Sequence, residues 1–344
     1  MSNNIAMIHG SGGAATGDLI HEVFASAFNN TVLSAMEDAA VVSLSSDGDV
    51  AGNGVSGQRL AVTTDSFVVT PVEFSGGDIG RLAVCGTVND LLMRGAVPKY
   101  ITSAWILETG ADIELLKRVV NSMADTAREA GVDVICGDTK VIEGQGGIYV
   151  NTTGVGYVPD GIDISAKGAR PGDVIIVSGT MGDHHAAILS ERMSIETDIK
   201  SDVAPLCEMC EGLRKLRVHT MRDVTRGGLG TVLKELALAS EVVFEVEDAA
   251  VPVDGKVKDF CGLLGLDPMY MGNEGKMVAI VDADDADAAL DVMRQAKYGE
   301  NAARIGTVVA ADEKKPAGSL YVRTAIGGIR ELDVMQGEGL PRIC

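Results

Sequence analysis

Basic residues and long apolar runs are both scarce in this chain of 344 residues. Only 29 lysines and arginines accompany 49 aspartates and glutamates, which gives a formal net charge of −20. A negative field of this size repels phosphate backbones, so a broad nucleic-acid-binding surface is excluded. No apolar run reaches the roughly 18 residues of a membrane span, and the N-terminus lacks the basic and apolar regions of a signal peptide.

Cysteines are few and scattered, at six positions, and without a secretion signal they indicate reduced thiols in a cytoplasmic protein. Cys207 and Cys210 form a C-x-x-C in a helical frame, but no second Cys or His pair is nearby in sequence to complete a zinc site. Buried or surface thiols are therefore the simpler interpretation. The neighbouring His184 and His185, at a predicted helix start, favour a solvated or capping role over metal binding.

Glycine, in contrast, is abundant, with 42 residues, whereas aromatic residues make up only 4% of the chain. Glycines cluster at 11–13, 75–80, 144–147 and 226–230. The second and fourth clusters open predicted helices, where free backbone N–H groups suit phosphate. Neither cluster matches a Walker A motif or a Rossmann fingerprint, so ordinary turns are an equally good interpretation.

Hydrophobic periodicity predicts strands and helices mixed in both halves of the chain. Predicted strands cover residues 59–70, 98–107, 132–138, 146–158, 173–179, 242–247 and 277–281. Predicted helices cover residues 78–94, 113–131, 182–193 and 286–296. The expected fold class is α+β, with mixed sheets packed with helices.

The length suits two domains, and a segment rich in glycine and proline, 158–173, marks the boundary between them. We therefore expect an N-terminal domain over 1–160 and a C-terminal α+β domain over 161–334. The last residues, 335–344, contain two glycines and a proline and are expected to form a mobile tail that ends in Cys344. From this feature alone, Cys344 is more simply an incidental tail residue.

Several aspartates lie in positions where a charge is costly. Asp65 lies inside a strand-like segment, and Asp90 follows Asn89 in the middle of an apolar helix. Similar positions, at strand ends or beside a glycine cluster, are those of Asp38, Asp138 and Asp223. A cap or a hydrogen-bonded buried acid explains any single one of them. As a set they suit Mg²⁺ ions, which prefer carboxylate oxygens and bridge to phosphates.

Six motifs together carry a family resemblance. They are HGSGG at 9–13, the segment 63–98, GDTKV at 137–141, MRDVTRGG at 221–228, GNEGK at 272–276 and the terminal PRIC at 341–344. They closely resemble the HypE family, the carbamoyl dehydratases of [NiFe]-hydrogenase maturation. The wider superfamily includes aminoimidazole ribonucleotide synthetase, selenophosphate synthetase and thiamine monophosphate kinase. This resemblance implies a two-domain fold, a homodimer formed through the N-terminal domain, and ATP bound with Mg²⁺ along acidic residues.

The resemblance also implies a reaction. A carbamoyltransferase, HypF, would place a carbamoyl group on Cys344, and ATP-dependent dehydration would convert it to a thiocyanate. The cyanide would then pass to an iron on a HypC–HypD complex. Catalytic roles would fall on Cys344, Lys140 and Glu274, with Glu274 as the base and Lys140 stabilising charge. Mg²⁺ or phosphate would be held by Asp38, Asp65, Asp90, Asp138 and Asp223. Further cofactor contacts would come from Gly12, Gly13, Asp78, Asn89 and Arg226.

Two other interpretations stay open at this point. An ATP-dependent small-molecule kinase or synthetase of the same superfamily would keep the aspartates but would not need PRIC. A non-enzymatic thiol carrier in hydrogenase assembly would need Cys344 but not the acidic residues. Selenophosphate synthetase is disfavoured, because HGSGG contains no cysteine. His185 stands where this family is expected to have glycine, which leaves the local geometry there open.

Overall fold

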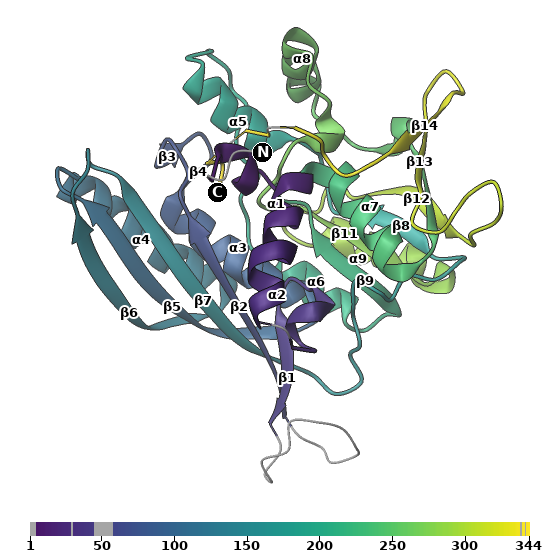
Figure 1. The fold of residues 1–344 in the computed structure, drawn as a ribbon, viewed down its shortest axis with the longest axis horizontal. Helices are drawn as coiled ribbons and strands as arrows, with labels where there is room; N and C mark the ends of the chain where they lie inside the picture. Colours follow the sequence, from purple (N-terminus) through teal and green to yellow (C-terminus); the bar gives the residue numbers. More distant parts are fainter. Residues whose placement is uncertain (1–4, 29, 45–57, 338, 341) are drawn as a thin grey trace.

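The computed structural model describes residues 5–28, 30–44, 58–337, 339–340 and 342–344. Two mixed sheets lie on opposite sides of the molecule, with helices between and around them (Figure 1). The first sheet has the order β1-β2-β7-β5-β6. Its strands are β1 Ala40–Leu44, β2 Gln58–Phe67, β5 Val97–Glu108, β6 Asp133–Ile142 and β7 Ile148–Val158. Within this sheet β5 and β6 are parallel, and the other pairs are antiparallel.

The second sheet has the order β14-β13-β10-β12-β8-β11-β9. Its strands are β8 Val174–Val177, β9 Val218–Asp223, β10 Val243–Glu247, β11 Met277–Val281, β12 Ala303–Val309, β13 Leu320–Arg323 and β14 Ile329–Leu332. The pair β10–β13 is parallel. A two-stranded ribbon, β3 Glu73–Phe74 and β4 Gly77–Asp78, lies apart from both sheets.

Two helices cover the inner face of the first sheet. They are α3 Ile79–Met93 and α4 Ile113–Ala130. Helix α3 begins at Asp78, whose side chain accepts hydrogen bonds from the backbone N–H groups of Gly80 (2.7 Å) and Arg81 (3.0 Å). It is buried on nearly every side, because it also contacts β9 and α6 of the second half. One hydrophobic core therefore runs across the junction of the two halves.

The remaining helices are mostly in the second half. They are α5 Asp183–Arg192, α6 Cys207–Leu213, α7 Gly228–Ser240, α8 Gly255–Leu264 and α9 Ala286–Gln295. Short helices near the N-terminus are α1 Ala14–Leu19 and α2 Ser26–Phe28. The π-helical segment η2 Ile20–Ala25 connects α1 to α2. Short 3-10 helices are η1 Met7–Gly10, η3 Leu33–Ala35, η4 Asp248–Ala250, η5 Pro268–Tyr270 and η6 Ala283–Asp285. Among the described residues, none of these helices has the length and apolar character needed to cross a membrane.

The first and last described segments of the chain lie near each other, beside α5 and the β3–β4 ribbon (Figure 1). The backbone N–H of Ala14 donates to the carbonyl of Met335 (3.2 Å), so the start of the tail contacts the N-terminal segment. At the other end of the tail, Ile343 and Cys344 are both buried. The tail is thus bound to the body in this structure, and its release stays a prediction.

Asn89 of α3 links the two halves of the molecule. Its side-chain amide donates to the carbonyl of Ala204 (3.0 Å) and accepts from the backbone N–H of Leu206 (3.0 Å), and all three residues are buried. This amide therefore provides hydrogen-bond partners for two buried backbone groups, one carbonyl acceptor and one N–H donor.

We expect Asn89→Ala to lower the free energy of unfolding by about 2–4 kcal/mol, because both backbone groups lose their partner in a buried position. Urea unfolding followed by circular dichroism measures this loss. The matched control is Gln145→Ala, which truncates an exposed amide and should change stability by less than about 0.5 kcal/mol. Equal effects of the two substitutions would contradict the linking role of Asn89.

Candidate active site

Four of the predicted aspartates lie close together where the two halves meet. Asp65 comes from the end of β2, Asp90 from α3 and Asp223 from the end of β9, while Asp38 precedes β1. Asp223 is buried and the other three are half-buried. The hydroxyl of Thr63 connects two of these segments, because it lies 2.8 Å from Asp90 Oδ2 and 3.1 Å from the carbonyl of Asp38.

A glycine allows the close approach between β2 and α3 at this point. A Cβ added to Gly86 of α3 would lie 2.9 Å from the ring of Phe67 and 3.8 Å from Asp65 Oδ2. A larger side chain would push the helix away from the strand. The sequence of α3 therefore brings Asp90 and Asp65 to the same site.

The electrostatics of this acidic cluster favour protons or cations. Burial raises the pKa of Asp90 well above its usual range, and the negative charges of Asp223, Asp38 and Asp65 raise it further. Burial and the charge of Asp38 raise the pKa of Asp223 to about 8. Carboxylates that repel one another in this way are suited to bind a divalent cation, which would restore their charged form.

Two arginines offset part of this negative charge. Arg222 forms an ion pair with Asp38 and lies 3.6 Å from Glu235, and its charge opposes the rise in the pKa of Asp38 that burial causes. Burial likewise raises the pKa of Asp65, and the positive charge of Arg226 opposes that rise. Asp38 is therefore already paired, whereas the side chain of Asp90 accepts a hydrogen bond from the hydroxyl of Thr63 and has no ion-pair partner among the described residues.

The thiol of Cys344 shares this environment with Glu274. Burial raises the pKa of Cys344, the charge of Arg226 opposes the shift, and Glu274, Asp65 and Asp223 add to it. Burial also raises the pKa of Glu274 well above its usual range. Glu274 Oε1 is buried and has no hydrogen-bond partner within the described part of the chain. A carboxyl with a raised proton affinity and an unpartnered oxygen is a candidate for proton transfer with a bound group.

The N-terminal glycine loop closes against the same site. A Cβ on Gly12, where φ is +81°, would lie 2.6 Å from Arg226 Cβ, and a Cβ on Gly13 would lie 2.5 Å from the carbonyl of Met335. Arg226 Nη1 donates to the carbonyl of Gly10 (3.1 Å). Glycine is required at 12 and 13 because both the arginine and the start of the tail contact the loop backbone.

Asp78 and Asn89 do not point into the acidic cluster. Asp78 caps α3, and Asn89 is hydrogen-bonded to Ala204 and Leu206. Their cofactor roles stay predictions without support from these contacts.

Asp138 and Lys140 lie elsewhere in this chain. Both are exposed on the edge strand β6 and are paired with each other (2.5 Å). The strand register runs from Ser66 through Asn151 and Ala104 to Asp138, so Asp138 lies three strand spacings, about 14 Å, from β2. Side chains alternate along strands, and Asp138 and Lys140 are on the face opposite to that of Asp65. A site formed by one chain alone therefore does not contain them.

Residues that the sequence did not single out also surround Glu274. Asp202 Oδ1 accepts the backbone N–H of Glu274 (3.1 Å), and Lys276 Nζ lies 3.7 Å from Asp202 Oδ2.

The expected solvated or capping role of His184 and His185 is wrong, since both are buried and the N-cap of α5 is Gly182. The available signal for Asp202 was that it is the one charged residue in the stretch 201–206, whereas no local signal indicated the contacts of His184.

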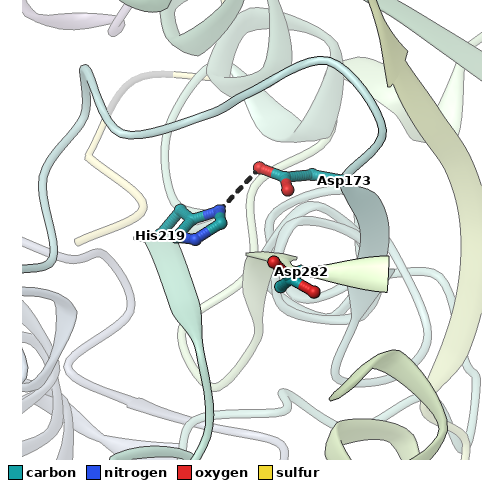
Figure 2. Close-up of side chains that lie close together, drawn as sticks. All are labelled: Asp173, His219 and Asp282. Atoms are coloured by element: carbon teal, nitrogen blue, oxygen red, sulfur yellow. Dashed lines mark hydrogen bonds and ion pairs between the residues drawn. The ribbon is translucent and has the colours of Figure 1, made fainter. Parts of the chain in front are cut away.

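A second group of possible ligands lies on the second sheet (Figure 2). His219 Nδ1 donates to Asp173 Oδ2 (2.8 Å), and Asp282 lies nearby. Asp173 also accepts the N–H of Arg170, while Asp282 accepts the N–H of Asp284 and pairs with Arg217. These groups are thus used in local hydrogen bonds that join turns to strands.

The two halves of the fold are recognised separately by protein-family models. Residues 36–158 match the N-terminal domain, and residues 170–318 the C-terminal domain, of AIR synthase related proteins. The expected two-domain α+β fold is therefore confirmed. The two halves of this chain therefore define it as an AIR synthase related protein.

Full-length relatives identify the family within that class. The chain is 47% identical, over 100% of its length and 95% of the relative, to carbamoyl dehydratase HypE of Cupriavidus necator. It is similar to a crystal structure of hydrogenase maturation protein HypE in complex with ATP, with a TM-score of 0.80 and 44% sequence identity. The match covers 99% of this chain and 100% of the other. A chain in the crystal structure of a HypE–HypF complex matches with a TM-score of 0.83 and 42% sequence identity, and the match covers 92% of this chain and 99% of the other. The chain belongs to the HypE family of carbamoyl dehydratases, enzymes of hydrogenase maturation.

The raised pKa of Asp223 predicts how stability depends on pH without added metal. An unfolded aspartate loses its proton near 3.8, whereas folded Asp223 keeps it up to about 8. The folded state therefore binds more protons in this window, and stability should fall as pH rises, by on the order of 1 kcal/mol per pH unit for each such group. Thermal unfolding in a chelator, from about pH 5 to about pH 8, measures the slope.

Asp223→Asn should flatten this slope, and Mg²⁺ should flatten it in the unaltered protein. Asp259→Asn, at an exposed position, is the matched control and should leave it unchanged. If stability falls with pH equally steeply in Asp223→Asn and in Asp259→Asn, the pKa of Asp223 is not raised and the prediction is wrong.

Proposed function

We propose that the protein dehydrates a carbamoyl group carried on the thiol of Cys344, with ATP as co-substrate, and yields a thiocyanate that donates cyanide to the iron of [NiFe]-hydrogenase. The observation that carries this proposal is the position of the tail. Its terminal thiol is buried beside Glu274 and the acidic cluster, where a carrier arm would present its cargo.

The residue types suit this chemistry. The carbamoyl group is an S-carboxamide, and its carbonyl oxygen becomes a good leaving group when it accepts the γ-phosphoryl group of ATP. The C–O bond then breaks, the oxygen leaves with the phosphate, and the loss of two N–H protons gives the C≡N bond. Glu274, with its raised pKa and unpartnered Oε1, is placed to accept these protons. Burial of the thiol keeps water away from the activated group.

The acidic cluster fits a bound metal ion. Asp65, Asp90 and Asp223 would hold Mg²⁺, with Asp38 partly satisfied by Arg222. Their mutual repulsion is the reason for this assignment, because a divalent cation would offset it. Mg²⁺ supplies charge neutralisation for phosphoryl transfer. We expect the glycine loop at Gly12 and Gly13, together with Arg226, to contact phosphate groups, as the family resemblance implies.

The proposed partners rest on the family resemblance together with the position of the tail. A buried Cys344 has to leave the site to receive its carbamoyl group, and the related HypE–HypF complex supports HypF as the partner that receives the tail. A HypC–HypD complex would take the cyanide. We also propose a homodimer through the first sheet, because β6 exposes Val134, Ile135, Val141 and Ile142 at its edge. In such a dimer Lys140 would act in the site of the partner chain.

Mass measurement of the C-terminal peptide tests the proposed reaction. When the protein carbamoylated on Cys344 is incubated with Mg²⁺ and ATP, this peptide should lose one water. Cys344→Ala should abolish carbamoylation, because alanine offers no nucleophile, while Cys207→Ala should react normally. Thiocyanate on an internal cysteine would contradict the carrier role, and carbamoylation without any dehydration would favour a thiol carrier alone.

Mixed dimers test the role of Lys140 across the interface. Lys140→Ala and Glu274→Gln should each be inactive alone. After the two variants are mixed under conditions that exchange subunits, about a quarter of the sites should regain both residues if they come from different chains. Mixing that restores no activity would place Lys140 and Glu274 in the same chain's reaction, or Lys140 outside it.

A further inference from the structure

The last three residues of the chain are held by their carbonyl groups. The backbone N–H of Thr70 donates to the carbonyl of Arg342 (3.1 Å), and that of Val68 donates to Cys344 (3.0 Å). The carbonyl of Ile343 instead accepts from Nε2 of His184 (2.6 Å). The tail is therefore clamped between the 68–70 backbone and helix α5.

His184 is fixed in one orientation and one tautomer. A carbonyl oxygen only accepts hydrogen bonds, so Nε2 must carry the hydrogen. Nδ1 then accepts from the hydroxyl of Ser201 (2.7 Å), which itself accepts the N–H of Val203 (3.1 Å). The ring of Phe74 packs against His184 edge to face, with centroids 5.4 Å apart. The imidazole is thus held ready to donate to the tail.

Other contacts make this end of the tail a defined position. Arg192, on the same helix, donates to the carbonyls of Thr70 (2.6 Å) and Arg342. The side chain of Ile343 lies against Gly272, where an added Cβ would come within 3.0 Å of it. These contacts and the hydrogen bond at Ile343 together hold the residue that precedes the thiol.

We propose that His184 is a positioning residue, which holds the carbonyl of Ile343 so that Cys344 is presented to Glu274 and the acidic cluster. This inference rests on the proposed carrier role of Cys344. His184 contacts the backbone of the tail and not the reacting group, so it would act on docking rather than on bond breaking.

Alkylation by iodoacetamide under native conditions tests docking directly. Cys210 is buried in the core and serves as the reference within each molecule, because only global unfolding exposes it. His184→Ala should raise the labelling of Cys344 relative to Cys210 about tenfold, since the carbonyl of Ile343 loses its partner. His184→Gln, which keeps an N–H donor, should restore most of the protection. His185→Ala is the control, one residue along the same helix, and should match the unaltered protein.

The proposal would be overturned if His184→Ala left the labelling of Cys344 relative to Cys210 unchanged. Equal labelling ratios in His184→Ala and His184→Gln would overturn it as well. If His184→Ala also exposes Cys210, Ser201→Ala replaces it. That variant keeps the imidazole but removes the hydroxyl that fixes its tautomer, and it should raise Cys344 labelling several-fold. Equal labelling in Ser201→Ala and the unaltered protein would then be the contrary result.

A second readout separates positioning from a general structural role. His184→Ala should accept the carbamoyl group from HypF at the normal rate but dehydrate it about tenfold more slowly, because the reacting group is no longer held in place. A parallel loss of both steps would overturn the assignment. If the unaltered protein shows no dehydration, the proposed function fails while the alkylation ratio still decides the docking role.

Discussion

Burial of several carboxylates at the junction of the two halves is the constraint on which this structure depends. Asp223 is fully buried there, and Asp38, Asp65 and Asp90 are partly removed from water. The desolvation of such groups is costly unless hydrogen bonds or opposite charges offset it. Within the described chain that compensation comes from Arg222, Arg226 and the hydroxyl of Thr63, and it is incomplete. The surplus negative charge is what makes the junction suitable for a cation.

The surrounding fold keeps this unfavourable arrangement in place. Helix α3 carries Asp90 and is enclosed by the first sheet, α4, α6 and β9, so it has little room to move its carboxylate towards solvent. Asn89, one residue earlier, is hydrogen-bonded to the backbone of the second half. A continuous core across the junction stabilises the contact between the halves, and that stability offsets the cost of the buried acids.

The tail is held in a way that suits a carrier arm. Its carbonyl groups, rather than its side chains, make most of the described hydrogen bonds at the terminus. Hydrogen bonds of this kind contribute modestly in net terms because water replaces them on release. Ile343 and Cys344 also pack in the hydrophobic core, so the tail leaves only when a partner or solvent takes over these apolar contacts as well as the hydrogen bonds.

Local signals in the sequence determined much of this protein. The predicted helices 78–94 and 113–131 match α3 and α4, because their boundaries depend on adjacent caps, Asp78 for the first and Gly131 for the second. The motifs also identified the family. Of the five aspartates predicted as ligands, Asp38, Asp65, Asp90 and Asp223 lie together in the structure, and Asp138 does not.

Only the tertiary structure decided where the remaining residues act. It places Lys140 and Asp138 on an exposed edge strand and holds Cys344 inside the site. It also connects His184 to Ile343, 159 positions further along the chain. Sequence patterns report neighbours along a helix or strand, whereas these positions depend on strand order and on segments that meet only after the two halves pack together.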